Sequence, residues 1–170
     1  GYSSAHINIE KVKERKFTSM PAFGVVPITV PGTPKGWATL IERFGKLSLL
    51  EVLTPAIELA RNGFALSETV GWYFERSIKR YQEVNTTEEY KHFFDVFTKN
   101  GEVYKSGDIF RSDDVADTLE SIGKTNAESF YTGELADKIV AFMEKHNGFI
   151  DRSDLAEYQN EMVEPIRVNY

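Results

Sequence analysis

The segment "VPITVPGTPKGWATLIERFGKLSLLEVLTPAIELARNGF", residues 26–64, passes from an extended stretch into two closely connected helices. The extended stretch covers residues 23–30, since Pro27 and Pro31 both prevent a helix there. Thr33 is then expected to be an N-cap, with Pro34 at the first helical position. Apolar residues recur at helical spacing beyond this point, at Trp37, Leu40, Ile41 and Phe44.

The second helix of this segment is predicted to begin after Ser48 and to end at Asn62-Gly63. Pro55 lies inside its pattern, which predicts a kink or a restart at Thr54. The two helices read as a structural hairpin that shares one core, made of Trp37, Leu40, Phe44, Leu53 and Ile57.

The remaining sequence is also mostly helical in pattern. Helices are expected over residues 7–16, with Ile9 and Val12 facing inward, and over 67–81, 87–97, 113–122, 127–132 and 134–145. A last short helix should begin at Asp151 or Ser153. Extended segments are expected at residues 102–110 and in the final "EPIRVNY", residues 164–170, which alternates like a strand. Residues 1–170 therefore read as a single, mainly α unit with short strands at its edges.

Composition excludes several classes of function. The 170 residues are 41% hydrophobic and 27% charged, which is ordinary for a soluble globular protein. The net charge is −6 and the basic residues are scattered, so no nucleic-acid partner is expected. No apolar run is long enough to span a membrane. Because cysteine is absent, these residues hold no disulfide, thiolate metal site or cysteine nucleophile.

Both ends of the chain are expected to be cuts in a longer protein. The sequence starts at Gly1 without a methionine, and it stops within the predicted strand at Tyr170. An isolated edge strand is an unusual place for a natural terminus.

Two short motifs suggest nucleophilic or phosphate chemistry but lack its other parts. Gly45-Lys46 resembles the end of a phosphate loop, but Leu47 stands where Ser or Thr would bind magnesium. A helix stop is the better interpretation. Ser121 and Lys124 match Ser-x-x-Lys, but at a helix end and without a companion motif.

The sequence evidence for metal and modification sites is equally weak. His6, His92 and His146 lie far apart and are interpreted as surface or capping residues. Asp151 and Asp154 look like part of a calcium loop, but acids at a helix start explain them better. The acceptor Asn85-Thr86-Thr87 matters only in a eukaryotic secretory setting. The residues alone indicate no catalytic constellation, no metal site and no cofactor.

Three stretches, in this order and spacing, together resemble the gamma-glutamyltranspeptidase family. They are Ile28–Phe64, Gly101–Ile150 and Asp154–Tyr170, and only the region from Ser67 to Asn100 is not distinctive. The combination spans nearly the whole chain and is more specific than any one motif in it.

The resemblance implies an N-terminal-nucleophile hydrolase with an αββα fold, made as a precursor that cleaves itself into a large and a small subunit. An N-terminal threonine of the small subunit would attack a gamma-glutamyl amide, with glutathione as a typical substrate. This chain resembles the helical lobe of the large subunit. Its partners would be the rest of that subunit and the small subunit, and its catalytic residues would lie outside residues 1–170. A periplasmic or extracellular location is implied, with a cytoplasmic one left open.

Tyr2 is the one candidate substrate-binding residue. Near residues 1–5 the family usually has an arginine that grips the substrate α-carboxylate, a role suited to a bidentate guanidinium. Here the stretch reads Gly-Tyr-Ser-Ser-Ala, although an arginine just before Gly1 would serve the same role. Tyr2 either donates a hydrogen bond to a substrate or packs at the start of a helix. Two alternatives to a gamma-glutamyl enzyme follow: an amide hydrolase like the cephalosporin acylases, or a non-catalytic helical binding module.

Overall fold

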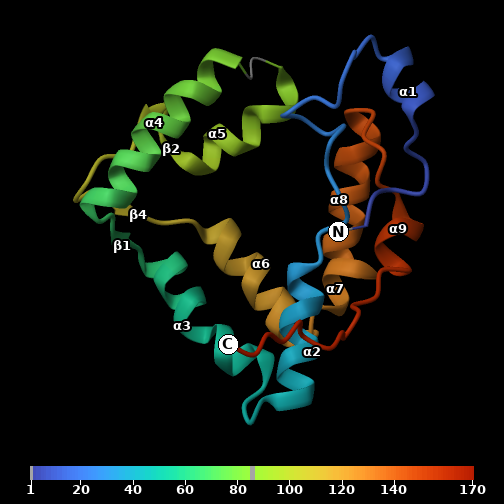
Figure 1. Cartoon of the computed structure of the whole chain (residues 1–170). Coiled ribbons are helices and arrows are strands. Elements are labelled where there is room, and N and C mark those ends of the chain that lie inside the picture. The colour runs from blue at the N-terminus through green and yellow to red at the C-terminus, as the bar shows by residue number, and fades with distance from the viewer. Residues whose placement is uncertain (1, 85–86) are drawn as a thin grey trace.

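The computed structural model describes residues 2–84 and 87–170, apart from the side chain of Val84 (Figure 1). Helices account for more than half of these residues, which confirms a mainly α unit. The helical elements are α1 (Ile9–Glu14), α2 (Thr33–Phe44), α3 (Leu49–Asn62), α4 (Glu68–Val84), the 3-10 turn η1 (Glu88–Tyr90), α5 (Lys91–Phe97), α6 (Asp113–Lys124), α7 (Glu128–Tyr131), α8 (Glu134–Lys145) and α9 (Arg152–Ala156).

The described strands are two residues long and form two antiparallel pairs. β1 (Phe64–Ala65) pairs with β4 (Ile109–Phe110), and β2 (Thr98–Lys99) pairs with β3 (Glu102–Val103). β1 follows α3 and β4 precedes α6, so the first pair holds the end of one helix beside the start of the other. The Ser112 amide donates to the Ala60 carbonyl at 2.9 Å and continues this connection.

Helices α3 and α6 pack along each other through a continuous apolar face. The buried residues at this contact are Ile57, Ala60 and Ala116, with Leu50, Leu53, Val115 and Leu119 packed against them. Gly123 allows a close approach of the two helices, because a Cβ atom there would lie 2.9 Å from the Leu50 Cα. This pair links the two ends of the molecule in Figure 1, where α4 and α5 lie on one side and α2, α7, α8 and α9 on the other.

The buried core lies mainly under α2, α7, α8 and α9. One cluster joins α8 and α9 to the extended segment before α2, through Val25, Val30, Ala136, Met143, Ile150 and Leu155. A neighbouring cluster joins α2, α3, α6 and α7 through Ala38, Leu49, Ile122, Ala127 and Tyr131. A smaller aromatic cluster of Leu66, Tyr104 and Phe110, packed by Phe74 and Phe97, fixes α4 and α5.

The predicted core of the helical hairpin is wrong for α2. Trp37, Leu40 and Phe44 are 37%, 52% and 68% exposed. Helix α2 buries Pro34 and Ala38 instead, and Ile41 on the same face packs against the core. The apolar pattern of this helix is wider than one face, so spacing alone cannot tell which side turns inward.

Three further sequence predictions need correction. Ile9 is exposed, and only Val12 of α1 is buried. Of the kink or restart predicted for the second helix, the restart at Thr54 is wrong, because α3 runs through Pro55 as one helix. The final segment 164–170 forms no strand and its side chains are exposed, because the described chain offers it no neighbouring strand with which to pair.

Candidate functional site

Tyr2 lies in an extended segment that precedes α1. Its carbonyl accepts a hydrogen bond from the Val30 amide at 2.8 Å, and its phenol donates to Glu161 Oε1 at 2.7 Å. The ring meets Tyr158 edge-on, with centroids 5.4 Å apart. Helix α1 begins only at Ile9, so Tyr158, and not the start of a helix, is the packing partner of Tyr2.

Tyr158 continues this aromatic contact to Tyr131. The two rings are stacked, with centroids 5.6 Å apart and an interplanar angle of 11°. The Tyr158 hydroxyl lies so close to Gly32 that a Cβ atom there would be 2.2 Å from the oxygen. We use the term tyrosine cluster for Tyr2, Tyr158 and Tyr131 together with Glu161. The absence of a side chain at Gly32 leaves the space that the Tyr158 hydroxyl occupies.

Tyr131 fixes the start of α2. Its hydroxyl donates to the Pro31 carbonyl at 2.6 Å and accepts from the Lys35 amide at 3.1 Å. The sequence predicts Thr33 as the N-cap, but Thr33 is the first helical residue, and the N-cap Gly32 has no side chain to accept a hydrogen bond. The buried phenol therefore satisfies one of the free amides of the first helical turn.

The electrostatics of the cluster favour binding over bond breaking. The hydrogen bond to the Glu161 carboxylate raises the pKa of the Tyr2 phenol, and burial raises the pKa of Tyr131. Both hydroxyls therefore stay protonated at neutral pH and act as donors. The Lys35 ammonium lies over the Tyr131 ring, 5.7 Å from its centroid, at the other end of the stack from Glu161. The cluster offers hydrogen bonds, aromatic surface and one carboxylate, but no activated nucleophile.

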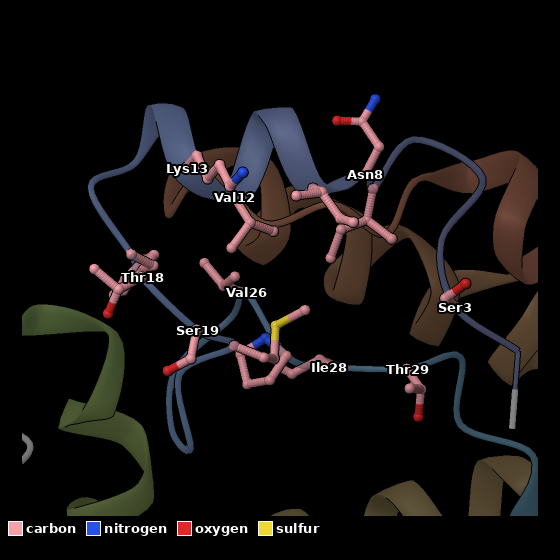
Figure 2. Close-up of a pocket in the computed structure, with 14 residues that line it drawn as sticks. Ser3, Asn8, Val12, Lys13, Thr18, Ser19, Val26, Ile28 and Thr29 are labelled. Carbon is pink, nitrogen blue, oxygen red and sulfur yellow. The ribbon is translucent and has the colours of Figure 1, made fainter.

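A hollow lies between α1 and the extended residues 26–29, and Figure 2 shows it in close-up. This groove has a volume of about 470 Å³. The buried side chains of Val12 and Val26 line it from opposite sides, and polar side chains such as Asn8, Lys13 and Thr18 lie at its margin (Figure 2). Ser3 lines the groove, whereas the Tyr2 side chain faces Glu161 and Tyr158. The groove and the tyrosine cluster therefore lie on different sides of the same segment.

The two short motifs have structural partners. The Gly45 amide donates to the Ile41 carbonyl at 2.8 Å and ends α2, which confirms the helix stop. Ser121 donates to Ser129 at 3.0 Å, while Lys124 pairs with Glu120 at 2.6 Å. Each member of the Ser-x-x-Lys pair is thus engaged elsewhere.

The three histidines are surface or capping residues, as expected. His6 pairs with Asp151 at 2.7 Å, and His92 lies 3.7 Å from Asp95. His146 is the C-cap of α8, and its ring contacts Phe142 with centroids 4.5 Å apart.

The acids near residue 151 belong to a helix start, which confirms that interpretation over a calcium loop. Asp151 and Asp154 form a capping box at the beginning of α9. The glycosylation acceptor at Asn85 and Thr86 lies outside the described residues. Within residues 2–84 and 87–170, no three His, Asp or Glu side chains are arranged to hold a metal ion. In the same part of the chain, none of the helices has the length and apolar character needed to cross a membrane.

The sequence proposes Tyr2 as a candidate residue, and it does not predict the contacts of the cluster with Glu161, Tyr158 and Tyr131. Glu161 is 159 positions from Tyr2, and Tyr131 is 100 positions from Pro31. No local pattern marks such contacts. The nearest signal is Gly32, a glycine in a helix start where a side-chain cap is the usual choice.

Comparisons with known proteins agree with this architecture. The glutathione hydrolase proenzyme of Pseudomonas aeruginosa is 34% identical over 142 residues, which are 83% of this chain and 24% of that protein. The crystal structure of a cephalosporin acylase from Bacillus halodurans is 40% identical and matches with a TM-score of 0.97, over 100% of this chain and 32% of that one. Helicobacter pylori gamma-glutamyltranspeptidase matches at 28% identity and a TM-score of 0.82, over 93% of this chain and 45% of that one.

These likenesses confirm the expected fold class, a helical lobe of a larger α+β protein of the N-terminal-nucleophile type. The chain spans about a quarter of the length of the curated relatives it matches. The profile described as gamma-glutamyltranspeptidase matches residues 1–170, the full length of the sequence. This chain therefore belongs to the gamma-glutamyltranspeptidase family.

Proposed function

We propose that the complete protein is a self-processing amide hydrolase or acyltransferase, and that this chain supplies the helical part of its large subunit. Family membership over residues 1–170 supports the reaction class. The short span relative to the relatives supports a nucleophile outside this chain. Its partners are then the rest of the large subunit and the small subunit.

The chemistry that we propose begins with a threonine at the N-terminus of the small subunit. Its hydroxyl attacks the carbonyl carbon of the substrate amide, and its own α-amine takes the hydroxyl proton. The amine product leaves with a proton, and the acyl group stays on the threonine as an ester. Water, or an acceptor amine, then attacks this ester and releases the threonine.

The contact of Tyr2 with Glu161 carries our proposal for the substrate class. By the resemblance to the family, a gamma-glutamyl site uses an arginine near this position, or just before Gly1, to pair with the substrate α-carboxylate. Tyr2 offers a single neutral donor, and that donor is engaged with Glu161 at 2.7 Å. We therefore propose an acyl group without the α-amino acid end, in keeping with the likeness to a cephalosporin acylase.

The test compares substrates on the full-length, self-processed protein. Leaving a carboxylate poorly paired costs about 2 to 5 kcal/mol of binding, so kcat/KM on glutathione should be at least about tenfold below that on a simple acyl anilide. A strong preference for glutathione would contradict the substrate class and point to a cation elsewhere that grips the α-carboxylate. Hydrolysis of neither substrate would support a non-catalytic binding module instead.

A further inference from the structure

We infer that Glu161 is a specificity-determining residue that disfavours substrates whose acyl group ends in a negative charge. This inference rests on the proposed function, which places Tyr2 at the acyl end of the substrate. The inference adds to the proposed function, because it predicts that the enzyme discriminates between a glutaryl group, which ends in a carboxylate, and a neutral acyl group of the same length.

Glu161 is held in place by the residues before it. The Asn160 side chain donates to Thr39 Oγ1 of α2 at 2.9 Å and accepts from the Tyr158 hydroxyl at 3.1 Å. The next residue is therefore fixed beside the tyrosine cluster, where Glu161 Oε1 accepts from the Tyr2 phenol at 2.7 Å. Both ends of the contact are anchored, since the Tyr2 carbonyl also accepts from the Val30 amide.

This arrangement opposes an anionic acyl group in two ways. The Tyr2 phenol has one proton, and Glu161 already accepts it. A substrate carboxylate near Tyr2 would also lie close to the Glu161 carboxylate. Within residues 2–84 and 87–170, no Lys, Arg or His side chain forms an ion pair with Glu161 at 4.0 Å or less, so these residues do not neutralise the charge.

The size of the effect follows from the separation of the charges. A substrate carboxylate at an assumed distance of about 5 Å from that of Glu161 would be repelled and, at an effective dielectric constant of about 40 to 80, bind about four- to sixteen-fold more weakly. Salt weakens this repulsion, because the Debye length is about 10 Å at 0.1 M ionic strength. The binding of a neutral acyl group is not weakened by this repulsion.

The experiment uses the full-length, self-processed enzyme and two matched substrates, glutaryl p-nitroanilide and its neutral primary amide. The quantity measured is the ratio of kcat/KM for the anionic substrate to that for the neutral one. Glu161→Gln should raise this ratio about tenfold, since it removes the charge and keeps the shape. The matched control is Glu164→Gln, a substitution on the same exposed segment, which should leave the ratio unchanged. Formation of both subunits on a gel confirms that each variant folds.

Tyr2→Phe separates the charge from the hydrogen bond. It removes the phenol donor and leaves the Glu161 carboxylate, so the ratio should stay low. An unchanged ratio in Glu161→Gln, or an equal rise in Tyr2→Phe, would overturn the inference while the enzyme remains active. Failure of the wild-type protein to hydrolyse either anilide would instead overturn the proposed function on which the inference rests.

Discussion

Replacing Tyr131 with phenylalanine should destabilise the first turn of α2. The hydroxyl of this residue, which is only 3% exposed, donates to the Pro31 carbonyl at 2.6 Å and accepts from the Lys35 amide at 3.1 Å. The substitution keeps the ring and its stacking on Tyr158, so only these two hydrogen bonds are lost.

The magnitude follows from the two bonds. A hydrogen bond contributes about 0.5 to 1.5 kcal/mol, and loss of a helix cap costs about 1 kcal/mol. Gly32 has no side chain with which to replace the cap, and Pro34 has no amide hydrogen. The expected loss in the free energy of unfolding is therefore about 1 to 3 kcal/mol.

Urea unfolding of wild type and variant measures the loss, and hydrogen exchange at the Lys35 amide shows where it arises. Exchange at Lys35 should become faster, because its acceptor is gone. Tyr73→Phe is the matched control, since Tyr73 is 58% exposed and should leave both measurements unchanged. A loss below about 0.5 kcal/mol together with unchanged exchange at Lys35 would refute the capping role of Tyr131.

The other predictions concern packing, pH and activity. Gly32→Ala should lower the free energy of unfolding, measured by urea titration, by about 1 to 3 kcal/mol, because its methyl group would overlap Tyr158. The control Gly36→Ala meets nothing within 4 Å and should raise the free energy of unfolding in the same titration. The hydrogen bond from the Asp154 amide lowers the pKa of Asp151 in the folded state. The ionised Asp151 therefore adds to the free energy of unfolding above the unfolded pKa of about 3.9, and this contribution is lost as pH falls through the folded pKa. Asp151→Asn should flatten that part of the pH dependence of the unfolding free energy. The isolated 170-residue chain should not hydrolyse gamma-glutamyl-p-nitroanilide; release of nitroaniline that persists through a second purification would place a nucleophile within it.

The helix boundaries could largely be predicted because they depend on neighbouring residues. Ser48 caps α3 and reaches Glu51, three positions on, and α6 begins at Asp113, as predicted, after the N-cap Ser112. The same is true of α8, whose bounds Glu134–Lys145 follow from its periodicity. In each case, the signal lies within the helix itself or in the residue that caps it.

The choice of inward face and the candidate site could not be predicted in this way. Helix α2 has apolar residues on more than one side, and packing against residues of α3, α6 and α7 buries Ala38 while Phe44 stays exposed. The contact of Tyr2 with Glu161 joins the two ends of the described chain. The sequence contains both residues, but long-range contacts such as the packing of Tyr158 between Tyr2 and Tyr131 and the bond from the Ala5 amide to Asp154 bring them together.

The support of α2 by Tyr131 also has a consequence for the order of folding during synthesis. The α2–α3 hairpin is complete by residue 62, yet the acceptor for the Lys35 amide is made 96 positions after Lys35. Contacts of such long range are slow to form, because the intervening chain must first be ordered. The first turn of α2 should therefore stay frayed on the ribosome until α7 has emerged. The hydrogen bond of the Ala5 amide should form later still, since its acceptor Asp154 follows 149 positions later in the chain.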